Sequence, residues 1–158
     1  MSREFLNAIA AHRAEIEHHW RTLLRIEPVT SPLANPETLR YLIPRTLTEI
    51  LDRAAKINRK VVTLEQARAP VPACTCGNNP YRAYFRAAEL AITEAGVLVQ
   101  ARLRPSVQQA ADLAELVYAV RSLARAEIDT FCGACTHRGR APNCRFAHAA
   151  STSSPEPG

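Results

Sequence analysis

Five cysteines are the residues of this chain best suited to chemistry, and four of them form two close pairs. One residue separates Cys74 from Cys76, and two residues separate Cys132 from Cys135. Because a close pair of thiolates can supply two corners of a tetrahedral site, two such pairs match the geometry that zinc prefers. The sequence therefore predicts a metal centre with Cys74, Cys76, Cys132 and Cys135 as its ligands.

The identity of the metal and the role of the fifth cysteine stay open at this point. Four thiolates also hold iron–sulfur clusters, so Zn²⁺ is the first expectation and an iron–sulfur cluster is the alternative. Cys144 offers a second ligand set, since Cys132, Cys135, Cys144 and His148 follow one another with zinc-finger-like spacing. His137 is a further possible ligand. The thiols could also be unliganded. Beside a cluster, Cys144 could act as a resolving cysteine or as a fifth, exchangeable ligand, or it could be a small semi-buried apolar residue.

Arginines flank the C-terminal cysteines, in a stretch with no acidic residue between Phe131 and Pro155. They are Arg138, Arg140 and Arg145. A zinc ion with four thiolates has a net negative charge, which basic neighbours would offset while donating hydrogen bonds to sulfur. A surface that binds phosphate or nucleic acid is the weaker alternative, because nothing in the chain resembles a recognition helix with base-reading side chains.

The elements that position these residues are predicted to be helices. Apolar side chains recur every three or four positions over residues 2–26, 36–57, 80–104 and 106–131, whereas strand-like alternation is nearly absent. Asn35-Pro36 and Asn79-Pro80 each provide a capping residue followed by a proline that suits a first helical turn. Pro44 predicts a kink or break in the second helix.

These four helices predict an all-α fold, an antiparallel four-helix bundle with up-down-up-down topology. The short joint at Pro105 makes the third and fourth helices a hairpin, so the start of the third and the end of the fourth lie at one pole. The two cysteine pairs, each expected on a loop, would meet there. We expect residues 1–149 to form one domain and residues 150–158 to be a disordered tail.

Two histidines of the first helix continue its apolar stripe. His12 and His19 are two turns apart, or about 10 Å, which is too far for both to bind one metal ion. We expect at least one imidazole to face the interior and to form a hydrogen bond with a neighbouring helix. A haem or other ligand pocket is the alternative.

Composition excludes several classes of protein. The 158 residues are 47% hydrophobic, enough for a core, and the net charge of +5 is modest. The odd number of cysteines and the lack of a signal-like segment predict reduced thiols in the cytoplasm. No apolar run is long enough to span a membrane. Phosphate-binding glycine loops, G-x-S-x-G and H-E-x-x-H are absent, which favours a protein that is not an enzyme.

The sequence therefore predicts a small cytoplasmic protein that binds metal and acts as a regulatory or adaptor module through contacts with another protein. An iron–sulfur or thiol-based redox sensor or electron-transfer protein is the alternative. Nucleic-acid binding through the arginine-rich loop is a weaker one. The sequence does not determine the oligomeric state.

Overall fold

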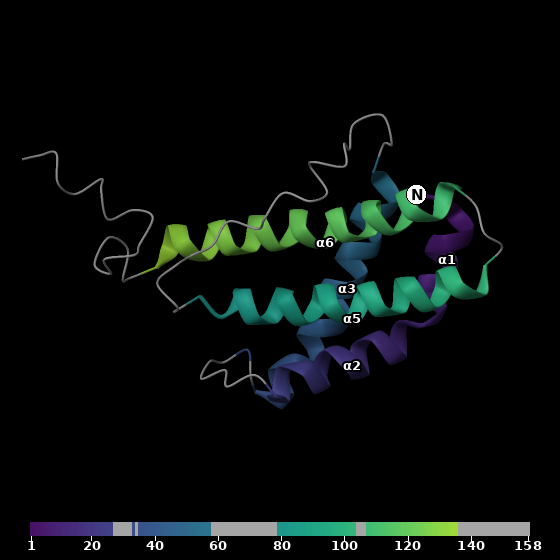
Figure 1. Cartoon of the computed structure of the whole chain (residues 1–158). Coiled ribbons are helices and arrows are strands. Elements are labelled where there is room, and N and C mark those ends of the chain that lie inside the picture. Colours follow the sequence, from purple (N-terminus) through teal and green to yellow (C-terminus); the bar gives the residue numbers. More distant parts are fainter. Residues whose placement is uncertain (27–32, 34, 58–78, 104–106, 136–158) are drawn as a thin grey trace, which may run out of the picture.

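The computed structural model describes residues 1–26, 33, 35–57, 79–103 and 107–135, and helices are the regular structure of these ranges, with no strand among them. The helices, labelled as in Figure 1, are α1 (Arg3–Ala11), α2 (Arg13–Ile26), α3 (Pro36–Lys56), α5 (Tyr81–Arg102) and α6 (Val107–Ala134). The predicted all-α fold is confirmed for this part of the chain.

Figure 1 shows α5 and α6 side by side and running in opposite directions. Helix α2 packs along α5, and α3 passes obliquely behind and contacts α6, α2 and α1. Helix α1 lies beside the end of α5 and the start of α6. The described helices are thus compatible with a bundle.

The first predicted helix is interrupted at His12, so the expectation of one continuous helix over residues 2–26 is wrong at that position. The His12 N–H donates to the Ile9 carbonyl oxygen, which ends α1, and α2 begins at the next residue. Figure 1 shows α1 and α2 pointing in different directions. The break lets the fully buried Phe5 and Ile9 enter the core from a different side than Ile16 and Trp20.

Both predicted capping asparagines act as caps. The Asn35 side-chain oxygen accepts the Glu37 N–H at 2.9 Å, at the start of α3. The Asn79 side-chain oxygen accepts the Tyr81 N–H at 3.0 Å, at the start of α5. Each cap satisfies a backbone donor that a helix leaves unpaired in its first turn.

Pro44 lies inside α3 and does not end it, since the helix continues to Lys56. Its carbonyl oxygen accepts the Thr48 hydroxyl at 2.8 Å and an Arg13 guanidinium N–H at 3.0 Å. The predicted break at Pro44 therefore does not occur. The arginine contact ties the middle of α3 to the start of α2.

Buried side chains from all five helices form one core cluster. Two hydrogen bonds cross it. The Trp20 indole N–H donates to the Tyr84 carbonyl oxygen at 3.0 Å, and the Tyr84 hydroxyl donates to the Thr46 hydroxyl at 2.9 Å. Because these groups are buried, the two bonds fix how α2, α3 and α5 are placed against one another.

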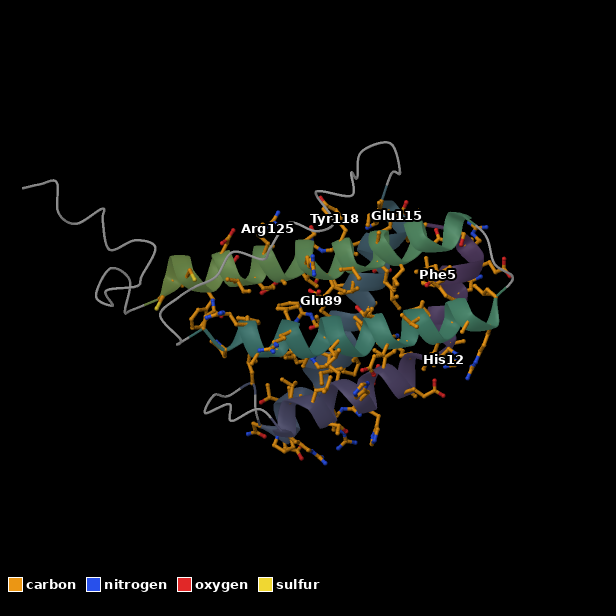
Figure 2. All side chains as sticks on the ribbon, viewed as in Figure 1. Phe5, His12, Glu89, Glu115, Tyr118 and Arg125 are labelled. Carbon is orange, nitrogen blue, oxygen red and sulfur yellow. The ribbon has the colours of Figure 1, made fainter. Side chains whose placement is uncertain are left out.

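Helices α5 and α6 are also joined by an ion pair. Arg121 donates two hydrogen bonds to the Glu89 carboxylate, from Nε at 3.0 Å and from Nη2 at 2.5 Å. This bonding raises the pKa of Arg121. In Figure 2, Glu89 lies on the side of α5 that faces α6. A bidentate contact of this kind sets the register between two neighbouring helices.

Candidate functional site

Cys132 and Cys135 lie at the C-terminal end of α6. Cys132 is inside the helix and 4% exposed, whereas Cys135 follows the last helical residue and is half-buried. Both thiols are free. The expectation that this pair lies on a loop is wrong for Cys132, because Ile128 and Cys132 extend the buried face of α6 by another turn.

Asn79 connects this end of α6 to the start of α5. Its side-chain nitrogen lies 3.4 Å from the Cys132 sulfur and 3.4 Å from the Ile128 carbonyl oxygen, and the residue is 4% exposed. The residue that precedes α5 therefore contacts the first cysteine of the C-terminal pair. Sequence reasoning identified Asn79 as a cap but missed this contact, which depends on how α6 is rotated about its axis.

The other residues predicted for the site lie outside the described residues. They are Cys74, Cys76, His137, Arg138, Arg140, Cys144, Arg145 and His148. Within the described ranges, no group of three or more His, Cys, Asp or Glu side chains is arranged to hold a metal ion. Of the four cysteines predicted as ligands, the described residues include Cys132 and Cys135.

Aromatic side chains surround the thiol end of the two helices. The Tyr81 ring lies 6.0 Å from the Phe131 ring in an edge-on arrangement and 6.1 Å from the Phe85 ring. A cavity of about 220 Å³ opens next to them between α3, α5 and α6, with Tyr81 and Glu127 among its lining residues. The lining of this cavity is mixed, since it also includes Arg45 and Glu49.

His12 and His19 line a second, smaller cavity of about 130 Å³ between α2 and α5. The His12 side chain is 27% exposed and lies against the Glu15 carboxylate, and its Nε2 is 3.2 Å from an Arg102 nitrogen. The His19 side chain is 36% exposed, with Nδ1 3.1 Å from a Glu94 carboxylate oxygen. Figure 2 places His12 beside the junction of α1 and α2.

Each imidazole is thus half-buried at the edge of a groove, with a carboxylate partner. Glu15 is three residues from His12, so that pair could have been predicted from helical spacing. The partner of His19 could not, because Glu94 comes from α5. The contact depends on the packing of two helices that are distant in sequence.

No helix among the described residues combines the length and the apolar character that crossing a bilayer requires. Compared with known proteins, the chain matches no family model, no curated protein and no solved structure.

Proposed function

We propose that this protein binds one metal ion, Zn²⁺, through Cys74, Cys76, Cys132 and Cys135. The observation that carries the proposal is the contact between Asn79 and Cys132 at 3.4 Å. Cys76 precedes Asn79 by three residues, a span of at most about 11 Å for an extended chain. The segment from Cys76 to Asn79 is short, and Asn79 contacts Cys132. This combination allows all four thiols to meet at the pole where α5 begins and α6 ends.

The electrostatics at the helix ends favour a bound cation. The C-terminal end of α6 has a partial negative charge, which opposes a thiolate at Cys132 or Cys135 unless a cation is bound there. The N-terminal end of α5 has the opposite sign and favours thiolates in the segment that leads into it. The Asn79 amide, which donates to the Cys132 sulfur, is the kind of partner that orients a metal ligand.

A metal site of this kind fits a regulatory or adaptor protein that acts through contacts with another protein. A metal ion would join the segment before α5 to the end of α6 and complete an antiparallel four-helix bundle in the cytoplasm, without catalysing a reaction. Three apolar side chains on α5 supply a contact surface for a protein partner, since Leu90, Val97 and Leu98 are 46%, 51% and 58% exposed. Exposed apolar side chains that share a helix face are typical of interaction surfaces.

A redox function is the second candidate, and it is favoured by the state of the two placed thiols. Both are free, they are three residues apart, and Cys135 is half-buried, so an oxidant could reach it. In this case the four thiols would hold an iron–sulfur cluster, or would be oxidised and reduced themselves.

The test is the metal content of the full chain, purified without oxygen and without added metal. We expect colourless protein with one zinc ion per chain. Cys132→Ser and Cys76→Ser should both lose the zinc, and Cys144→Ser, the matched control, should keep it. Cys76 lies outside the described helices, so loss of zinc in the Cys76→Ser variant would not be explained by a packing defect in α6.

Other outcomes decide against the zinc proposal. A brown sample whose absorption is bleached by a reductant would support the cluster. Loss of zinc in Cys144→Ser with retention in Cys76→Ser would assign the ligand set that includes Cys144. Metal-free protein whose melting temperature is the same in Cys76→Ser would show that the thiols bind no metal.

A further inference from the structure

Three arginines line one cavity, of about 310 Å³, between the end of α2 and the start of α3. Arg21 and Arg25 come from the last two turns of α2, and Arg40 comes from the second turn of α3. Pro36 and Leu39 complete the lining. The cavity therefore combines three guanidinium groups with two apolar side chains, and neither Cys132 nor Cys135 is among its lining residues.

Positive side chains outnumber negative ones around this cavity among the described residues, where the acidic residues are Glu17 on α2 and Glu37 in the first turn of α3. Arg21 is 3.1 Å from Glu17, but the same carboxylate also lies 3.3 Å from Arg13. Within the described part of the chain, Arg25 and Arg40 are both exposed and take part in no ion pair. The Glu17 carboxylate is thus shared by Arg13 and Arg21. Arg25 and Arg40 add further positive charge nearby.

This concentration of charge is unfavourable for the folded protein alone. Arg21 and Arg25 are four residues apart on α2, a spacing at which like charges repel. The N-terminal end of the long helix α3 adds a partial positive charge at Pro36, whereas the C-terminal end of α2 adds a partial negative charge near Arg25. An anion bound in the cavity would remove the repulsion.

We propose that this cavity binds the phosphate group of a small phosphomonoester. A phosphate dianion matches the planar guanidinium groups, which bind phosphate oxygens through pairs of parallel hydrogen bonds. The apolar part of the ligand lies against Pro36 and Leu39. The volume of about 310 Å³ is at the lower end of the range for small-molecule sites, which favours a ligand with one ring over a larger molecule.

The inference is independent of the metal site. Figure 1 shows the end of α2 and the start of α3 on the side of the molecule where α5 begins and α6 ends, but none of the cavity's residues is a predicted metal ligand. Failure of one proposal therefore leaves the other standing.

The experiment is titration calorimetry of the full chain with phenyl phosphate at low salt, repeated with inorganic phosphate. We expect phenyl phosphate to bind more tightly than inorganic phosphate, since only the ester can use the apolar lining. Arg25→Gln and Arg40→Gln should each raise Kd by about tenfold to a hundredfold, the usual range for losing a hydrogen bond to a charged group. The control Arg86→Gln changes an exposed arginine of α5 that is outside the cavity, and should leave Kd unchanged.

A second measurement separates binding from folding. Without ligand, Arg25→Gln and Arg40→Gln should melt close to the temperature of the original protein. Each removes a repulsive charge together with a favourable one, since Arg25 lies in the last turn of α2 and Arg40 lies three residues after Glu37. The proposal is wrong if phenyl phosphate does not bind, if Arg86→Gln weakens it equally, or if inorganic phosphate binds as tightly as the ester. Tight binding of a single-stranded oligonucleotide, with no binding of phenyl phosphate, would assign the cavity to nucleic acid instead.

Discussion

The side chain of Asn79 lies within 3.4 Å of the Cys132 sulfur, and this contact joins the start of α5 to the end of α6 across 53 positions of sequence. The same side chain caps α5 by accepting the Tyr81 N–H at 3.0 Å and approaches the Ile128 carbonyl oxygen with its nitrogen. One buried amide therefore has a local role and a long-range role, and the two can be separated by mutation.

Replacing Asn79 by alanine removes both roles, whereas replacing Asn35 removes only a cap, because Asn35 is an exposed residue at the start of α3. We expect Asn35→Ala to lower the free energy of unfolding by about 1 kcal/mol. Asn79→Ala should lower the free energy of unfolding by about 2–4 kcal/mol, since the buried Cys132 sulfur and Ile128 carbonyl oxygen also lose a partner. Urea denaturation followed by circular dichroism measures both. Equal losses in the two variants would show that the contact with Cys132 contributes nothing.

Tyr84 makes stability depend on pH in the alkaline range. Its ring is 1% exposed, and burial raises the pKa of Tyr84 above the ordinary value of about 10. Above that pH the unfolded chain loses the hydroxyl proton while the folded chain keeps it. The contribution of Tyr84 to the free energy of unfolding is therefore fully present below pH 10. It falls as the pH rises further, by up to about 1.4 kcal/mol per pH unit.

Comparison with Tyr84→Phe isolates this effect, because phenylalanine cannot ionise. Below pH 10 the original protein should be more stable by about 1 kcal/mol, owing to the hydrogen bond with Thr46 at 2.9 Å. The difference should shrink and then reverse as the pH rises from 10 to 11. Urea denaturation at several pH values measures it. A difference that stays constant over this range would mean that Tyr84 is accessible to solvent in the folded state.

Gly96 is a position where α5 closely approaches α6. A Cβ atom placed there would lie 2.6 Å from the Leu113 Cδ1 atom, closer than real contacts allow, and 3.7 Å from the Phe5 ring. Alanine is favoured over glycine inside a helix by about 1 kcal/mol, so two effects oppose each other in Gly96→Ala. Because the clashing atom is the end of a flexible side chain, we expect little net change in stability.

The two effects separate when Leu113 is shortened. In a Leu113→Ala background the clash is absent, and Gly96→Ala should then stabilise the protein by about 1 kcal/mol. A double-mutant cycle measured by urea denaturation gives the coupling between the two positions. Strict additivity would mean that the side chain of Leu113 does not contact Gly96.

These residues show which features of the structure can be predicted from the sequence. The caps at Asn35 and Asn79 are local, since an asparagine before a proline determines them within three residues. The buried faces of the helices follow from apolar periodicity in the same way. The C-terminal cysteine pair was expected on a loop, whereas α6 continues to Ala134, and Gly133 within it has open space around it.

Features that depend on two distant elements could not be predicted. The contact of Asn79 with Cys132 and that of His19 with Glu94 require the rotation of each helix about its axis. The cavity of Arg21, Arg25 and Arg40 requires the position of α3 against α2. The break at His12 has no glycine or proline to indicate it, and α1 is held to another part of the chain by its first residues.

Helix α1 is held to α6 by a hydrogen-bonded pair, Ser2 and Asp112. The Asp112 carboxylate accepts the Ser2 N–H at 2.8 Å and the Ser2 hydroxyl at 2.5 Å, and Asp112 is 2% exposed. The Ser2 hydroxyl oxygen also caps α1 by accepting the Phe5 N–H at 3.3 Å. Helix α1 has nine residues, too few to be stable alone, so it depends on this pair and on the burial of Phe5 and Ile9.

Weakening the pair should therefore loosen α1 before the rest of the protein unfolds. We expect Asp112→Asn to lower the free energy of unfolding by about 1–3 kcal/mol, and Ser2→Ala by about 1 kcal/mol. The effects should be less than additive, because each variant disrupts the same contact. Hydrogen exchange, measured on protein without an N-terminal tag, should show faster exchange for α1 amides than for α5 amides in Asp112→Asn. Ser122→Ala, a half-buried serine of α6, is the control, and uniform acceleration in all helices would contradict a local role for the pair.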